Sequence, residues 1–141
     1  MSHDASKVLM GQTNSSVKEV SNHVGTIGAG LVVHLKSDDT ITVAKADGGA
    51  LGVSLGKDLS NIGYTSIARK GLSVPIKLAS GYTTPAKGGQ VAINDTTGEA
   101  RAYTGTGDSY VNAYWVSGVL TGIFEDGTEA NVALADFPGG L

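Results

Sequence analysis

Short runs of alternating apolar and polar residues, each ending in turn-forming residues, extend over most of the chain. The clearest run passes from Leu72 through Val74 and Ile76 to Leu78, with an apolar residue at every second position. A period of two places these side chains on one face of a β-strand. From residue 27 onward, similar runs recur at intervals of about ten residues, separated by Gly, Asp, Asn, Ser and Thr. The pattern predicts about eight short strands, arranged as a sandwich, jelly roll or barrel.

Turn and strand-breaking residues refine this prediction. Pro75 lies inside the clearest strand and has no amide hydrogen to donate, so we expect 72–78 to be a sheet edge or to contain a bulge. The polar residues Lys36–Thr40 separate two apolar runs and predict a hairpin. Glu125–Thr128 predicts a second hairpin, because its Asp-Gly pair tolerates the positive φ of a tight turn.

Residues 1–24 differ from the rest of the chain. Ser, Asn and Gln are frequent there, and apolar residues such as Val8, Leu9 and Met10 are scattered between them. We expect an extended N-terminal arm over residues 1–24 that packs where it has a surface to lie on, followed by a single β domain over residues 25–141. A frayed terminus is the alternative interpretation.

The composition agrees with a β-rich globular domain. Glycine accounts for 21 of 141 residues, and an interior glycine costs a helix about 1 kcal/mol relative to alanine. With 40% hydrophobic and 16% charged residues, the chain has too much apolar sequence for a disordered protein. The predicted fold is therefore all-β, as a jelly roll or a related sandwich or barrel with an extended N-terminal arm.

The charge distribution argues against several classes of partner. The formal net charge is −3 and the basic residues are dispersed, whereas nucleic-acid binding needs a basic stripe that displaces counterions. No apolar stretch approaches the roughly 20 residues of a membrane-spanning helix. The chain has no cysteine, so disulfides and thiolate metal sites are excluded. We expect neither nucleic acid nor a membrane as a partner.

One segment matches an enzymatic motif. Gly52–Gly56 reads G-x-S-x-G, which in hydrolases places a nucleophilic serine on a tight turn. In those folds the histidine follows the serine, but His3, His23 and His34 all precede Ser54. We therefore interpret the glycines as turn positions and predict no catalytic residue.

Metal and cofactor signals are equally weak. Zinc needs three or four converging ligands, and the three histidines offer no such set. Asp38-Asp39 and Asn94–Glu99 carry oxygen ligands, but neither follows a calcium-loop pattern, and turn formation explains both. A phosphate loop would need a hydroxyl after Gly56-Lys57, where Asp58 stands. The sequence predicts no metal site and no cofactor.

Contact residues are suggested by three features. Tyr114 and Trp115 are adjacent in a predicted strand, so one should face the core and the other the solvent. Aromatic side chains give large contact areas with few rotatable bonds and often anchor interfaces. With the apolar residues of the arm and of the Pro75 strand, the candidate interface residues are Val8, Leu9, Met10, Leu72, Val74, Pro75, Tyr114 and Trp115.

The order of segments in 71–141 carries a family resemblance. It consists of the alternating strand, Lys87-Gly-Gly-Gln-Val91, the polar turn with Thr97-Gly98, Val116-Ser-Gly118, Glu125-Asp-Gly-Thr128 and Val132-Ala-Leu134. This half of the chain resembles the small capsid cement, or decoration, proteins of tailed bacteriophages, which share its Ala, Gly, Thr and Val texture.

The resemblance implies a structural protein, not an enzyme. It would be made in the host cytoplasm and would sit on the outer capsid surface of the virion, where it bridges neighbouring copies of the major capsid protein. Members of this family include β-barrel and jelly-roll forms and bind as dimers or trimers, and we expect a homodimer before a trimer. A phage tail or fibre module and a small carbohydrate-binding β domain remain alternatives.

Overall fold

The chain folds as an all-β protein, as its sequence predicts. The computed structural model describes residues 7–9, 18–45, 49–57, 63–105, 109–123 and 129–141. Within these ranges there is no helix, and hence none that could cross a membrane. The strands are β1 (Lys7–Leu9), β2 (Lys18–Val24), β3 (Val32–Leu35), β4 (Ile41–Thr42), β5 (Ala50–Lys57), β6 (Tyr64–Lys77), β7 (Gln90–Ile93), β8 (Ala100–Ala102), β9 (Ser109–Trp115), β10 (Leu120–Ile123) and β11 (Glu129–Phe137).

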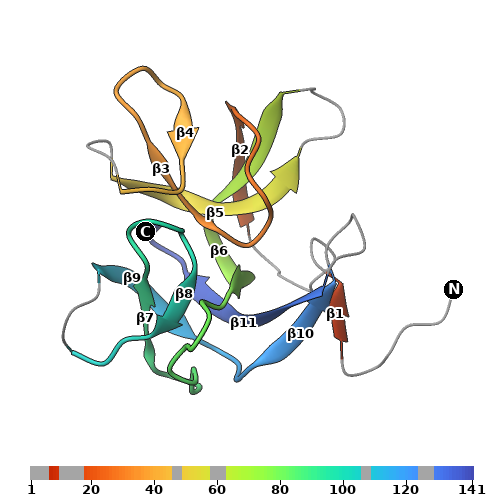
Figure 1. Ribbon diagram of the computed structural model, residues 1–141, viewed down its shortest axis with the longest axis vertical. Coiled ribbons are helices and arrows are strands. Elements are labelled where there is room, and N and C mark those ends of the chain that lie inside the picture. The colour runs from red at the N-terminus through yellow and green to blue at the C-terminus, as the bar shows by residue number, and fades with distance from the viewer. Residues whose placement is uncertain (1–6, 10–17, 46–48, 58–62, 106–108, 124–128) are drawn as a thin grey trace, which may run out of the picture.

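Hydrogen bonds join these strands into one sheet. Its main path runs β4-β3-β5-β6-β11-β9-β7-β8, while β2 pairs with β6, and β10 lies between β11 and β1. The 14-residue strand β6 passes from the upper half of the molecule, formed by β2 to β5, into the lower half (Figure 1). A bridge between Leu78 and Ala100 returns the end of β6 to β8, so the lower strands close into a ring. The jelly-roll arrangement within the all-β class is not confirmed.

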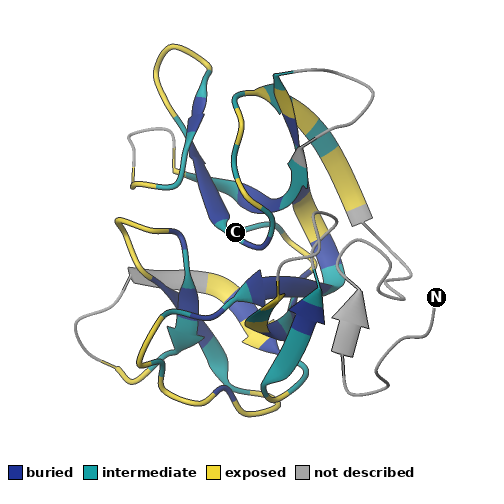
Figure 2. Cartoon of the chain, turned by 45° about the vertical axis from the view of Figure 1, so that its right-hand side comes forward, coloured by how far each residue is buried: buried dark blue, intermediate teal, exposed yellow. Residues whose placement is uncertain are grey.

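The larger apolar core spans both halves of the molecule, because Val32 of β3 and Val53 of β5 belong to it, and a smaller cluster lies in the upper half. In the lower half, Trp115, Phe137 and Ile76 are among the largest fully buried side chains. In the upper half, Val33, Ile41 and Ile67 form a smaller cluster beneath partly buried neighbours. Figure 2 colours the described residues by burial: buried and exposed positions alternate over residues 112–115 of β9, whereas β3 and β7 each bury three consecutive residues. Both faces of β3 and β7 are therefore covered, and fully burying an apolar side chain contributes roughly 1.5–3 kcal/mol.

The predicted hairpin at residues 36–40 is confirmed. Lys36 N–H donates to the Thr40 carbonyl at 2.8 Å, and Asp39 has a φ of 66°. Asp38 supports the turn because its carboxylate accepts from the Thr40 amide at 3.1 Å. The other predicted hairpin, Glu125–Thr128, lies outside the described residues.

The strand around Pro75 is buried and is not an exposed sheet edge, which corrects the edge part of that prediction. It pairs with β11 along 71–77, and Pro75 is fully buried. Lys77 N–H donates to the Gly30 carbonyl at 2.8 Å, on the side away from β11. Two residues earlier, the nitrogen of Pro75 faces that same side, so its missing hydrogen costs the β6–β11 ladder nothing.

A bulge lies two residues before Pro75, as the alternative part of that prediction allowed. Gly71 stands opposite Phe137 and Val74 opposite Ala135, so three steps along β6 match two along β11. Ser73 lies in the bulge with a φ of 54°, and its amide donates to the Asp136 carboxylate at 2.7 Å. The side chain of Asp136 thus replaces the ladder bond that the bulge removes.

Part of the expected N-terminal arm belongs to the sheet. Residues 18–24 form β2 and pair antiparallel with β6 from Gly71 to Tyr64. Farther toward the N-terminus, β1 pairs with β10 in parallel orientation. The boundary expected after residue 24 therefore coincides with the end of a paired strand.

Candidate functional site

The serine of the G-x-S-x-G segment has a structural role. Ser54 is 1% exposed; its hydroxyl lies 3.3 Å from the Ile27 carbonyl and accepts from the Gly56 amide at 3.1 Å. His34 pairs with Ala50 on β5. At about 3.3 Å per residue, Ser54 lies about 13 Å farther along that strand. The hydroxyl therefore fastens the segment after β2 onto β5 and does not meet His34.

The two glycines of this segment are explained by packing. A Cβ at Gly52 would overlap the carbonyl oxygen of Ala68 on β6 and approach the Ile67 side chain to 2.9 Å. Gly56 has a φ of 99°, which favours glycine. Gly52–Gly56 therefore lies within a strand that pairs with β6, not in the turn expected from the sequence, and packing and backbone conformation account for its two glycines.

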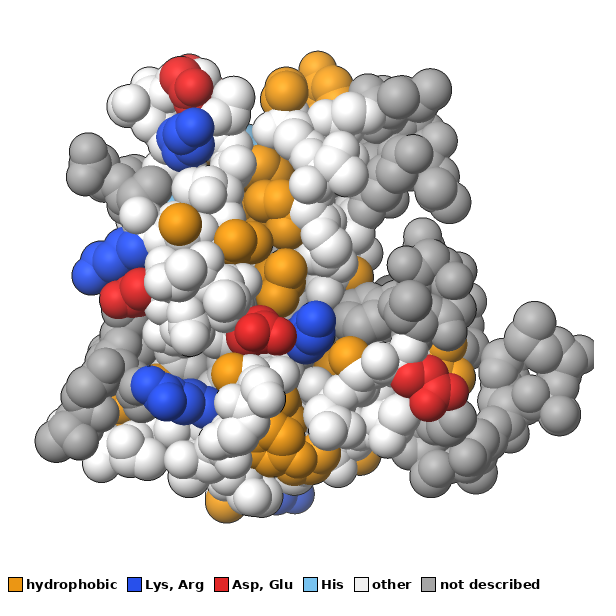
Figure 3. Space-filling model, viewed as in Figure 1, with side chains coloured by type: hydrophobic (Ala, Val, Ile, Leu, Met, Phe, Trp, Pro, Cys, Tyr) orange, Lys and Arg blue, Asp and Glu red, His pale blue; other side chains and the backbone are white. Residues whose placement is uncertain are grey.

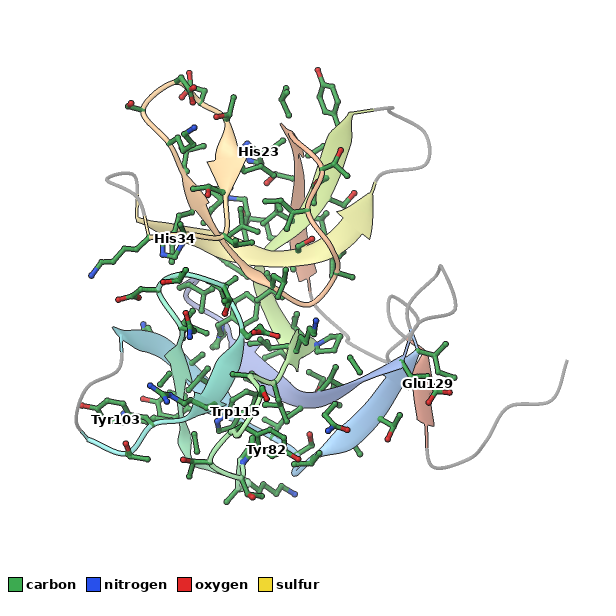
Figure 4. All side chains as sticks on the ribbon, in the orientation of Figure 1. His23, His34, Tyr82, Tyr103, Trp115 and Glu129 are labelled. Carbon is green, nitrogen blue, oxygen red and sulfur yellow. The ribbon has the colours of Figure 1, made fainter. Side chains whose placement is uncertain are left out.

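The buried histidine His34 lies where the two halves meet, below His23 on β2 (Figure 4). Burial lowers the pKa of His34, and this outweighs Asp95 and the Val43 carbonyl, which act in the opposite direction. Its Nδ1 atom is buried without a hydrogen-bond partner. No three His, Asp or Glu side chains gather as a metal site in the described part of the chain. His34 is therefore held as a neutral core residue.

The second oxygen-rich segment is a turn, as the sequence indicated. The Asn94 side-chain oxygen accepts from the amides of Thr96 at 2.8 Å and Thr97 at 3.1 Å. Gly98 completes the turn with a φ of 75°, and its carbonyl accepts from the Val32 amide at 2.8 Å. The Asn94 side-chain oxygen therefore accepts hydrogen bonds from amides of its own turn. The hydrogen bond from Val32 to Gly98 joins the β7–β8 turn to β3 in the upper half.

The adjacent aromatic residues face opposite sides, as predicted. Trp115 is 1% exposed and packs in the lower core near the partly buried Tyr82, whereas Tyr114 is 45% exposed. Figure 4 shows Trp115 and Tyr82 together in the lower half. Trp115 is therefore a core residue, and its place among the candidate contact residues is corrected.

The structure separates the other candidate contact residues. Val74 and Pro75 are buried, and Leu72 is half-buried, so these three offer little surface. The backbones of Val8 and Leu9 lie in β1, and Met10 is outside the described residues. Among candidates whose side chains the structure describes, Tyr114 is the exposed one.

A different surface gathers exposed apolar side chains. Val20 and Val24 on β2 are 48% and 50% exposed, and Tyr64 on β6 is 40% exposed. Val24 stands opposite Tyr64, and Asn22 opposite Ser66, so these residues share one face of the β2–β6 pair. We call this face the β2–β6 patch and define it by Val20, Asn22, Val24, Tyr64 and Ser66. Exposed positions along β2 are visible in Figure 2.

The β2–β6 patch carries no charged side chain. In its middle, the Ser66 hydroxyl donates to the Asn22 side-chain oxygen at 2.8 Å, which satisfies both groups. At one end Glu19 lies 3.5 Å from Arg69 and 3.7 Å from Lys70. These exposed ion pairs contribute about 0–1 kcal/mol each. The patch thus combines three exposed apolar side chains with one hydrogen-bonded polar pair, and its border carries one carboxylate beside two basic side chains.

The face of the molecule in Figure 3 shows charges as isolated groups or opposite pairs among apolar and neutral side chains. The sequence contained a signal for the β2–β6 patch in valines 20 and 24 within a polar segment. That signal could not be used without knowing that β2 pairs with β6.

No known protein-family model and no curated protein sequence matches this chain.

Proposed function

We propose that this chain is a structural cement protein that binds the outer surface of an assembled phage shell and bridges its major capsid subunits. The observation that carries the proposal is the β2–β6 patch, in which Val20, Val24 and Tyr64 expose apolar surface together. Apolar groups clustered on a protein surface mark sites of interaction with other macromolecules. Tyr114, elsewhere on the molecule, supplies a second contact point for bridging.

The proposed mechanism is stabilisation by selective binding. A protein that binds the assembled lattice and not separated subunits shifts the equilibrium toward the lattice. At a concentration 100 times the dissociation constant, each site contributes about 2.7 kcal/mol. Because the patch lies on a hydrogen-bonded sheet, little conformational entropy is lost on binding.

The proposal predicts weak dependence on salt. The net charge is −3, the patch is uncharged, and Glu19 is already paired with basic side chains. Long-range steering and exposed ion pairs therefore contribute little to binding. Contact through apolar surface and hydrogen bonds should persist in moderate salt.

The test is thermal disruption of undecorated, expanded phage shells with and without this protein. We expect the wild-type protein to raise the disruption temperature at low and at high salt. Val24→Asp should weaken this effect because it places a charge in the β2–β6 patch. Thr83→Asp is the matched control, since Thr83 is exposed, its carbonyl accepts from the Ala102 amide of β8, and it receives the same charge.

Two outcomes would contradict the proposal at different levels. Absence of any rise with the wild-type protein would reject the cement function. If Val24→Asp and Thr83→Asp raise the disruption temperature as much as each other, the cement function stands and the patch is rejected as the contact surface. Both variants should first be shown to unfold at the wild-type urea concentration, since both positions are exposed.

A further inference from the structure

The outermost strand, β1, is attached to the sheet along one side. Its residues pair in parallel with β10, with Lys7 opposite Thr121, Val8 opposite Gly122 and Leu9 opposite Ile123. In the described part of the chain β1 pairs with no other strand. It lies at the lower right of Figure 1, at the end of the β11-β10-β1 series.

The pairing of β1 with β10 is short. It comprises three residue pairs, whereas β2 pairs with β6 at seven positions. A three-residue edge strand makes few hydrogen bonds, so it opens at a small fraction of the free energy of global unfolding. Opening leaves the other pairings of the described strands unchanged, because β10 is the strand with which β1 pairs among them.

The sequence between β1 and β2 gives β1 a considerable reach. Residues 10–17 separate the two strands, and β2 begins beside Gly71 in the middle of β6. Nine residue steps from Leu9 to Lys18 span at most about 30 Å when fully extended. This length is comparable to the diameter of a small domain, so β1 can extend to a neighbouring molecule.

We propose that when two copies of this chain lie side by side, they exchange β1: each β1 pairs with the β10 of the other copy. The exchanged pair makes the same three residue pairs in the same register as the pair within one chain. Exchange of an identical element therefore costs little beyond association, which is the general reason that strand swapping is an accessible route to dimers.

A second copy is the occupant that this edge fits. Gly122, in the middle of β10, is buried and stands opposite Val8. The acceptor edge is thus already matched to 7–9 of this chain, and only another copy supplies both that strand and that edge. Reciprocal exchange also leaves neither β10 edge unpaired, so the assembly closes at two chains.

Local concentration decides between the two pairings. Covalent connection within one chain holds β1 near its own β10 at an effective concentration on the order of millimolar. The β10 of a neighbouring copy held at a similar local concentration competes with the chain's own β10 for β1. The inference rests on the β1–β10 pairing and not on binding to a shell, so it applies to the free chain at high concentration.

The absence of cysteine from the sequence makes disulfide trapping specific. Lys7→Cys and Thr121→Cys place two thiols at paired positions. The double variant in one chain should close within that chain at micromolar concentration. A mixture of the two single variants at about millimolar concentration should form a cross-linked dimer containing one chain of each, which mass spectrometry identifies.

The matched control mixes Lys7→Cys with Ser37→Cys, whose thiol is in the exposed β3–β4 turn of the upper half. We expect several-fold more cross-linking in the 7–121 mixture than in this control. Equal cross-linking in both mixtures, with the double variant closing within one chain, would overturn the exchange. Failure of the double variant to close would overturn it as well, by removing the β1–β10 pairing. Shell binding by the closed double variant is measured separately and reports on the proposed function alone.

Discussion

Replacement of Gly52 by alanine tests the pairing of β5 with β6 directly. Gly52 does not have a positive φ, so the added Cβ meets a packing limit and not a backbone limit. That Cβ would overlap the Ala68 carbonyl oxygen and lie 2.8 Å from the Ala68 carbonyl carbon and 2.9 Å from Ile67 Cγ2. Backbone atoms cannot rotate away as a side chain does, so β5 must move off β6.

The expected cost follows from this geometry. Overpacking of a protein core costs about 1–3 kcal/mol, and sometimes more. Because two of the three close atoms belong to the backbone of β6, we expect a loss of about 3 kcal/mol or more in the free energy of unfolding. This is a large part of the roughly 5–15 kcal/mol that holds an ordinary domain folded. The melting temperature should fall by about 10 °C.

Trp115 provides the assay. It is the one tryptophan of the sequence and is 1% exposed, so its fluorescence reports unfolding of the lower core in urea. Gly28→Ala is the control: its Cβ meets no atom within 4 Å and its φ is not positive. It should leave stability unchanged or raise it by about 0.4–1 kcal/mol. A Gly52→Ala protein within about 0.5 kcal/mol of wild type would refute the described packing of β5 on β6.

Three further substitutions test individual contacts. Asp136→Ala should destabilise by about 1–3 kcal/mol because the Ser73 amide loses its acceptor; Asp136→Asn should largely restore stability in the same urea titration. The lowered pKa of His34 means that the unfolded chain binds a proton more readily. Stability should therefore fall as pH decreases below about 6.5, by up to about 1.4 kcal/mol per pH unit, and His34→Gln should flatten this dependence. Ser54→Ala should cost about 1–2 kcal/mol because its hydroxyl is buried between Ile27 and Gly56, and a serine-directed fluorophosphonate should not label the wild-type protein.

The strand around Pro75 shows where sequence reasoning stops. Alternation along 72–78 predicted a strand, and proline predicted an edge or a bulge. The bulge is present at Ser73, but the strand is buried against β11 instead of exposed. The residue type shows that Pro75 has no hydrogen-bond donor. Only the tertiary structure shows that its nitrogen faces away from β11, where the β6–β11 ladder needs no donor.

The candidate contact surface shows the same limit. The pair Tyr114-Trp115 had to face opposite sides of its strand, which follows from the two-residue period alone. Which of the two is buried depends on strands far away in the sequence, since β9 pairs with β7 and β11. The β2–β6 patch was missed for the same reason, because Val24 and Tyr64 stand opposite each other only when β2 pairs with β6.

The amino-acid sequence by itself determines the all-β class and the turn at residues 36–40. These features depend on local chemistry, namely side-chain periodicity, glycine content and the hydrogen bonds of Asp38 with its own turn. The tertiary structure decides which strands become neighbours, why Gly52 must lack a side chain, and which apolar residues remain on the surface. Every strand offers the same backbone donors and acceptors, so partner choice depends on burial of the whole chain and cannot be read from any one segment.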